Sequence, residues 1–285
     1  MTTRTIVVVG GLAKRYITEA EEVPALGETI ETTKPLDPHT GGRGAFAAVA
    51  AHRLSHIKPP GGSHIGLESA WPELKINVHL VATVGADDAG DSLKERMNEC
   101  GVNADHVQQV EGASSSSVFV VVDKATKDHR VWFDAVANHI LKPDAFKERG
   151  SLNNFAGGMK PALLLTSLEL KPETTEQLIK TAGLDGVEVL LNLVPSHSVL
   201  RRVLKNVTHL IIHKAEARRS YEDCPTDDDD PSAWAPLAQR FVDRGAKNVV
   251  ITLSTQGACF ANRFGAAGFV RSDEPEDVNN KVGGG

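Results

Sequence analysis

Short apolar runs rich in β-branched residues recur along this chain, and segments of helical pattern separate them. Apolar runs at residues 6–9, 78–84 and 162–166 alternate with helical patterns at residues 44–54 and 89–100. Strands that are apolar on both faces are typical of a parallel sheet, because helices cover both of its sides. The alternation therefore predicts an α/β fold with a central, mostly parallel sheet and helices on both faces.

The same rhythm continues toward the C-terminus. Gly101 and Gly245 follow two of the predicted helices and are suited to ending them, since glycine adopts the left-handed conformation of a helix C-terminus. The remaining predicted strands are residues 187–193, 209–213 and 248–253, and the remaining predicted helices are residues 172–183 and 232–244.

Two regions break this rhythm. Residues 28–36 alternate as a half-exposed strand does, and residues 114–134 hold two such runs with a turn at 124–128. We expect them to form a small β-sheet lid, with lid segments at about 12–40 and 114–135, on one domain that spans residues 1–285. Residues 56–74 are expected to be a surface insertion, and the four aspartates at 227–230 a solvated loop.

The bulk composition excludes several classes of function. The formal net charge of the 285-residue chain is −6, so no general electrostatic attraction favours nucleic acid or an anionic membrane as partner. The three cysteines form no CxxC pair and no metal-ligand spacing, which favours reduced thiols. No apolar run approaches the ~20 residues of a membrane helix. We expect a cytoplasmic protein with a small-molecule substrate.

A glycine-rich turn precedes the first predicted helix. Its sequence is Gly41-Gly42-Arg43-Gly44-Ala45. Glycines at a helix N-terminus let backbone amides approach a ligand closely, but a tight turn with close helix packing would need the same residues. The motif by itself leaves both interpretations open.

The segment at residues 81–91 carries the most specific pattern. Here a predicted strand leads into the turn Val84-Gly85-Ala86-Asp87-Asp88-Ala89-Gly90 and then into a helix that ends before Gly101-Val102. This order resembles the PfkB family of ribokinase-like carbohydrate kinases, whose pattern is VG-x-D-x-x-G. Further segments resemble family motifs in the family's order: Pro24 to Thr29 (lP-x-x-GET), residues 41–54 (GGKGANQAVAAARLG), Ala135 to Asn138 (pGAN), Leu165 to Glu169 (LLQLE), Leu191 to Pro195 (lNpAP), His213 to Ala217 (NxxEA), Ile251 to Ala258 (iTLGxxGa) and Val282 to Gly285 (the start of TGAGD).

The resemblance implies phosphoryl transfer from ATP, with Mg²⁺, to a hydroxyl of a sugar or nucleoside-like substrate. In the family an aspartate removes the hydroxyl proton, and here that residue would follow Gly285. The amides of Gly283, Gly284 and Gly285 would form the anion hole. Positioning and electrostatics dominate such chemistry.

The resemblance also implies the binding residues. Glu216 would help to hold Mg²⁺, which prefers carboxylate and water ligands. Glu169 and Glu216 could instead be ordinary acids of a helix entry or loop. The implied nucleotide site is Asn192, Thr252, Ser254 and Gly257, and the implied substrate site is Gly41, Gly42, Arg43, Arg15, Phe46 and Glu169.

Several positions depart from the family pattern on the substrate side. Ala13 and Arg15 stand where the family has Asn and Asp, and Phe46 replaces the Asn of GGKGAN. A site that lacks these polar partners loses selectivity for a polyhydroxyl substrate, so simple ribose is not expected. Lys14, Arg15 and Arg43 could favour an anionic ligand. Elsewhere, His213 replaces an Asn, Ser254 a Gly and Asn280 an Asp.

Two classes of function remain open. One is a PfkB-family kinase, expected to be inactive as this chain because the catalytic aspartate position is missing. The other is a degenerate, non-catalytic ligand-binding or regulatory homologue, which the scattered changes favour. A dinucleotide-binding dehydrogenase is disfavoured by the lack of a GxGxxG motif. We also expect exposed apolar surface on one sheet face, self-association, and a homodimer contact through the lid segments.

Overall fold

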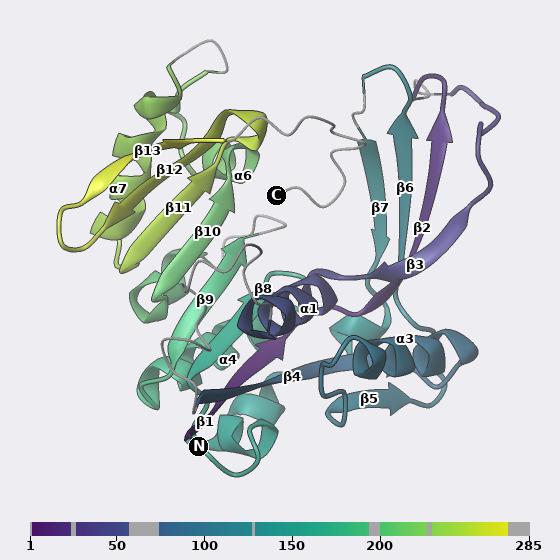
Figure 1. Cartoon of the computed structure of the whole chain (residues 1–285), viewed down its shortest axis with the longest axis horizontal. Helices are drawn as coiled ribbons and strands as arrows, with labels where there is room; N and C mark the ends of the chain where they lie inside the picture. Colours follow the sequence, from purple (N-terminus) through teal and green to yellow (C-terminus); the bar gives the residue numbers. More distant parts are fainter. Residues whose placement is uncertain are drawn as a thin grey trace, which may run out of the picture.

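The computed structural model describes residues 2–23, 27–56, 74–126, 129–193, 200–226 and 230–272. The main sheet has the strand order β13-β12-β11-β10-β9-β8-β1-β4-β5, and every strand pair is parallel except those that β12 makes with β11 and β13 (Figure 1). The strands of this sheet are β1 (Thr2–Val9), β4 (Leu74–Gly85), β5 (Val107–Val110), β8 (Leu163–Ser167), β9 (Glu188–Leu193), β10 (His209–His213), β11 (Asn248–Thr252), β12 (Gly257–Asn262) and β13 (Ala267–Arg271).

Helices lie on both faces of this sheet. The α-helices are α1 (Arg43–His56), α3 (Asp88–Glu99), α4 (Pro172–Leu184), α5 (Leu200–Val203), α6 (Lys214–Ser220) and α7 (Ala235–Asp243). Of these, α4 and α7 lie on one face and α1 and α3 on the other. Short 3-10 helices lie at Ala137–His139, Pro143–Phe146, Ser151–Phe155, Leu204–Asn206, Pro231–Trp234 and Ser254–Gln256. The helix predicted at 232–244 is therefore two pieces, a 3-10 turn followed by α7.

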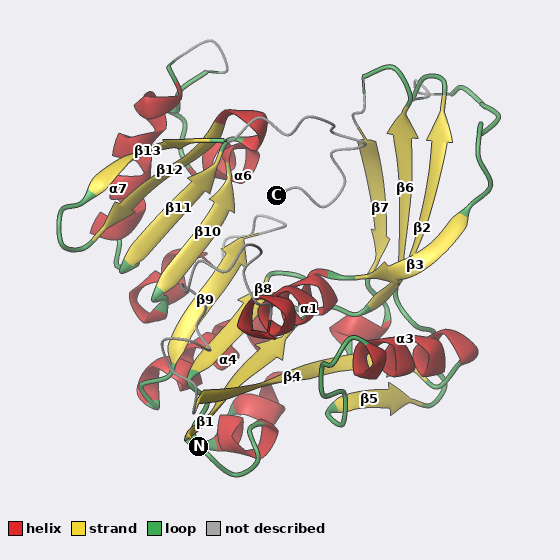
Figure 2. Cartoon of the chain, viewed as in Figure 1, coloured by secondary structure: helices red, strands yellow, loops and turns green. Residues whose placement is uncertain are grey.

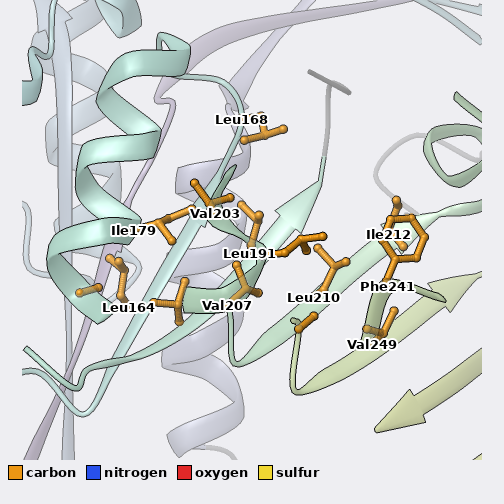
Figure 3. Packing of buried hydrophobic residues seen from close by; sticks show 14 of the residues in the cluster. Leu164, Leu168, Ile179, Leu191, Val203, Val207, Leu210, Ile212, Phe241 and Val249 are labelled. Carbon is orange, nitrogen blue, oxygen red and sulfur yellow. The ribbon is translucent and has the colours of Figure 1, made fainter. Parts of the chain in front are cut away.

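The alternation of side chains along each strand divides the apolar residues into two cores. The larger core joins alternate residues of β1 and β8 to β11 with α4 and α7 (Figure 3). There Leu164, Leu191 and Leu210 are fully buried. The smaller core joins the other face of β1 and β4 to α1 and α3, and contains Val8 and Leu93. The sheet is thus covered by helices on both sides, as the sequence pattern predicts.

One part of the second face has no helix of the described chain over it. Beyond α1, the side chains of Leu163, Leu165, Leu190 and Ile211 are only half-buried. They line a groove of about 420 Å³ whose wall is mainly apolar. Helix α1 lies over β1, β4 and β8, so this half-buried apolar groove runs beside it along β8, β9 and β10.

A second, four-stranded sheet stands beside the main one (Figure 2). Its order is β3-β2-β6-β7, with β2 and β6 parallel and the other pairs antiparallel. Its strands are β2 (Ala13–Ala20), β3 (Asp37–Gly41), β6 (Ser117–Asp123) and β7 (His129–Asp134). The hairpin of β6 and β7 confirms the two runs predicted at residues 114–134.

The strand predicted at residues 28–36 is wrong. These residues are exposed and form no regular strand, so the alternating apolar side chains are not buried against a second layer. The segment contacts β2 through the Thr33 amide, which donates to the Glu19 carbonyl at 2.7 Å. Pro35 has no amide hydrogen to continue such a ladder, and regular pairing with β2 begins only at Asp37.

Some predictions fall outside the described residues. They are the lP-x-x-GET segment in part, most of the insertion at 56–74, three of the four aspartates at 227–230, Val194-Pro195, Asn280 and the anion hole at Gly283 to Gly285. Within the part that is described, no helix is both long and apolar enough to cross a membrane.

Candidate functional site

The glycine-rich turn is built by backbone segments that pack directly on one another. Gly42 has φ +94°, and a Cβ there would lie 2.7 Å from the carbonyl carbon of Gly11. A Cβ at Gly44 would lie 2.6 Å from the carbonyl carbon of Gly10. The end of β1 and the start of α1 can approach this closely only because these positions carry no side chain. The turn therefore lies at the carboxyl end of β1, where open α/β sheets bind their ligands.

Glu169 is buried against the backbone of this turn. Its side chain is only 8% exposed, and its carboxylate accepts the Arg43 amide at 2.8 Å. Burial raises the pKa of this carboxyl, while the amides of Arg43, Gly44 and Gly11 act in the opposite direction. Glu169 therefore fixes the turn from behind, which fits the structural alternative left open by the sequence.

Asn138 and Ser167 complete this half of the site. The side-chain oxygen of Asn138 accepts the Leu12 amide at 3.2 Å, so its Nδ2 group points the other way. That Nδ2 atom and the hydroxyl of Ser167 are buried without a hydrogen-bond partner among the described residues. Buried polar groups are nearly always hydrogen-bonded, so these two groups mark a place where a polar ligand would find partners.

The carboxyl ends of β10 and β11 form the other half. The His213 side chain accepts the Ala215 amide through Nδ1 at 3.3 Å. Its proton is therefore on Nε2, which donates to the Ser254 hydroxyl at 3.0 Å. Burial lowers the pKa of His213, and the nearby charge of Glu216 opposes that shift. His213 thus joins the start of α6 to the turn after β11.

Ser254 has a strained backbone. Of the non-glycine residues that the structure describes, it is the one with a positive φ, at 57°. A side chain in the left-handed region costs roughly 1–2 kcal/mol, and such strain collects at functional sites. The hydrogen bond from His213 helps to hold Ser254 in this conformation.

Glu216 and Thr252 lie at the same edge of the sheet. Glu216 is 8% exposed, and its Oε2 atom, 3.7 Å from His213 Nδ1, accepts no hydrogen bond within the described chain. The Thr252 hydroxyl is likewise buried and unpartnered. No cluster of three or more metal-ligating side chains occurs among the described residues. Mg²⁺ commonly uses one or two carboxylates, waters and substrate phosphates, so Glu216 fits a magnesium–nucleotide complex but not an all-protein metal site.

The other predicted residues are more scattered. Asn192 lines the apolar groove together with Arg43. Gly257 has φ +120° and packs on the backbone of β13, so its demonstrated role is to shape the hairpin. Arg15 and Phe46 meet each other, with the guanidinium carbon 5.0 Å from the ring centre. Their contact lies in a different groove, between the small sheet and α1.

Sequence reasoning did not assign Asn138 and Ser167 to the site, although both lie in segments that resemble family motifs. The signal that reveals them is their buried, unpartnered atoms, which only coordinates provide.

Comparison with known proteins decides the family. The model of the pfkB family of carbohydrate kinases matches residues 3–285. The chain belongs to this family. Among curated relatives, a ribokinase of Schizosaccharomyces pombe is 26% identical over 285 residues, which cover 98% of this chain and 81% of that protein.

Solved structures show the same fold. Arabidopsis thaliana ribokinase complexed with ribose and ATP superposes with a TM-score of 0.74 at 19% identity, covering 99% of this chain and 82% of that one. A Burkholderia thailandensis nucleoside kinase in complex with inosine gives a TM-score of 0.68 at 16% identity, covering 98% and 80%. The PfkB-family protein described here is therefore a ribokinase-like sugar kinase homologue with a nine-stranded main sheet and a four-stranded lid sheet.

Proposed function

We propose that this PfkB-family protein transfers the γ-phosphoryl group of ATP to a hydroxyl of a sugar or nucleoside-like substrate. One observation carries the proposal: four buried polar atoms without a hydrogen-bond partner among the described residues lie at or beside the carboxyl ends of the main-sheet strands. Asn138 Nδ2 and Ser167 Oγ lie on the side of the glycine-rich turn, and Glu216 Oε2 and Thr252 Oγ1 lie on the side of β10 and β11. Groups left unpaired in this way are costly unless a ligand engages them.

The proposed reaction is an in-line displacement at the γ-phosphorus. The acceptor hydroxyl oxygen forms a bond to phosphorus and the bond to the bridging oxygen of ADP breaks. The hydroxyl proton passes to a carboxylate base, which the family resemblance places just after Gly285. Mg²⁺, when bound, neutralises charge on the phosphate oxygens. The carboxylate of Glu216 would help to hold that ion, while Thr252 and Ser254 would contact the nucleotide.

The glycine-rich turn would bind the acceptor. Gly10 and Gly11 pack on Gly42 and Gly44, and the side chains of Glu169 and Asn138 lie beside Gly11. Backbone groups and the side chain of Arg43 are then available to a small polar molecule, and Glu169 keeps the turn in place from beneath.

A second candidate is a non-catalytic homologue that binds a ligand without transferring phosphate. The contact of Arg15 with Phe46 favours it, since these residues replace the family's Asp and Asn and cannot accept hydrogen bonds from sugar hydroxyls. The two candidates differ in one observable, which is ATP-dependent formation of a phosphorylated product.

The experiment is a phosphotransfer assay with a panel of sugars and nucleosides. ADP release and the ³¹P NMR signal of the product are followed with ATP and Mg²⁺. We expect ADP to appear only with an acceptor, in equal amount to a new phosphate ester. Acceptor binding without any ester would refute the kinase proposal and support the second candidate.

We further propose that a second copy of the chain pairs through the lid sheet. Tyr16, Phe119 and Trp132 form a row across β2, β6 and β7, with Tyr16 and Phe119 stacked at 5.1 Å. Trp132 is 52% exposed on β7, an edge strand of that sheet. Exposed apolar edges favour association. Trp132→Lys is expected to shift sedimentation toward the monomer, and an unchanged sedimentation coefficient would refute the pairing.

We also propose a cytoplasmic location. Its support is that Cys100, Cys224 and Cys259 are free thiols, which a reducing compartment preserves. Oxidised cysteines in protein isolated under alkylating conditions would count against it.

A further inference from the structure

A groove of about 550 Å³ lies between the lid sheet and the helices of the smaller core. Its wall includes Thr40 of β3, just before the glycine-rich turn, Ala45 at the end of the turn and Phe46 of α1 just after it. The groove therefore begins beside the proposed acceptor site. Its other walls are formed by β2, by the rest of α1 and by α3.

Arg15 is the most informative residue of this groove. It lies on β2 opposite His39 of β3, and its Cβ packs against Gly41, where a Cβ would come within 2.7 Å. Its Nε atom is buried, yet no described residue accepts a hydrogen bond from it. Burial also lowers the pKa of this guanidinium, which nevertheless stays charged because arginine does not deprotonate in proteins.

Among the residues that the structure describes, no carboxylate forms an ion pair with Arg15. A buried N–H group such as this Nε–H is costly unless an oxygen acceptor engages it. Phe46, which is 41% exposed, lies against the guanidinium, whose carbon is 5.0 Å from the centre of the ring. The edge of a guanidinium, with Nε and the terminal nitrogens, is the part that binds carboxylate or phosphate with two hydrogen bonds.

The charge balance of the groove also favours an anion. Lys14, Arg15 and Arg53 line it, and none of them forms an ion pair with another described residue. The carboxylate of Glu99 on the opposite wall is bound to Arg96 at 2.7 Å, so Glu95 is the one acid of the groove without an ion pair to a described residue. Three unpaired cations thus face one unpaired carboxylate.

We infer that this groove binds the anionic group of a sugar derivative, a carboxylate or a phosphate, through the side chain of Arg15. The inference rests on the proposed function in one respect: the bound molecule is the acceptor of the phosphotransferase. Arg15 and Phe46 would then make the site selective for charged sugars instead of neutral polyhydroxyl sugars.

Matched pairs of probes test this inference by calorimetry. The neutral members are ribose, glucose and inosine, and their charged partners are ribose 5-phosphate, gluconate and inosine 5′-monophosphate. The proteins are the wild type, Arg15→Gln and Arg15→Lys. Arg263→Gln is the control, because Arg263 also stacks on a phenylalanine, Phe264 at 4.8 Å, but on the distant β12–β13 hairpin. Circular dichroism confirms that each variant is folded.

We expect at least one charged probe to bind about tenfold or more tightly than its neutral partner, because hydrogen bonds to charged groups are the stronger ones. Arg15→Gln should abolish that preference, Arg15→Lys should restore part of it, and Arg263→Gln should leave it unchanged. The inference would be overturned if every neutral probe bound at least as tightly as its charged partner. It would also be overturned if the preference for a charged probe survived in folded Arg15→Gln. The same probes are then tested in the phosphotransfer assay. If the preference for charged probes depends on Arg15 but no probe is phosphorylated, the inference of anion binding stands and the kinase proposal fails.

Discussion

Gly42 is the position where the local backbone geometry makes the sharpest prediction. In Gly42→Ala the alanine must adopt a backbone φ of +94°, and its methyl group must overlap the backbone of Gly11. The left-handed conformation costs roughly 1–2 kcal/mol. The overlap adds roughly 1–3 kcal/mol, since its neighbours are backbone atoms that can move only with β1. We expect the free energy of unfolding to fall by about 3 kcal/mol.

Gly112→Ala separates the two contributions. Gly112 has φ +72° in an exposed turn, and a Cβ there would meet nothing within 4 Å. That variant should lose only the roughly 1–2 kcal/mol of the backbone conformation. The assay is urea unfolding followed by circular dichroism, with nucleotide and acceptor binding measured on the folded variants. Equal losses of stability in the two variants would refute the close approach of β1 and α1 at the glycine-rich turn.

Three further predictions concern single side chains. Burial alone would raise the pKa of Asp87, but hydrogen bonds from Ser115 and Gly90 lower it overall. Asp87→Ala should therefore reduce the free energy of unfolding by about 1–2 kcal/mol at pH 7. In urea unfolding, this difference from the wild type should shrink as the pH falls through the lowered pKa, below about 4. A difference that persists at low pH would contradict this role. Ser254→Gly should be more stable than Ser254→Ala by about 1 kcal/mol, because glycine removes the strain at φ 57°; equal melting temperatures would refute that strain. Ile211→Asp, in the half-buried apolar groove, should reduce binding of a hydrophobic dye and self-association at little cost in stability; a loss comparable to that of a core residue would mean that the groove is closed.

The sequence predicted six strands of the main sheet, β1, β4 and β8 to β11, because they are continuous apolar runs. It missed β5, β12 and β13, which lie at or next to the edges of the sheet. Runs such as Ile6 to Val9 and Leu210 to Ile212 have no polar residue to solvate, so they are recognisable without any knowledge of their partners. The lid was harder. Residues 28–36 alternate like a strand but stay exposed, whereas β2, with Lys14, Arg15 and Glu19, is polar and pairs on both sides.

The site was predicted in part, for a related reason. The glycine-rich turn and Glu216 stand in motifs, so their positions at the strand ends follow from the fold. The direction of a side chain does not follow from its position in the sequence. Glu169 faces the amides beneath the turn, and Arg15 stacks on Phe46; both contacts join residues that lie far apart in the chain.

Calorimetry of ATP binding in the presence of Mg²⁺ tests the central claim most directly. The wild-type chain is compared with Glu216→Gln and with Glu188→Gln, an exposed acid at the opposite end of the same sheet. We predict one nucleotide site per chain, with affinity reduced about 10- to 100-fold in Glu216→Gln, as for loss of a group that holds a metal, and unchanged in Glu188→Gln. Absence of nucleotide binding by the folded wild-type chain, or equal affinities in all three proteins, would contradict the account.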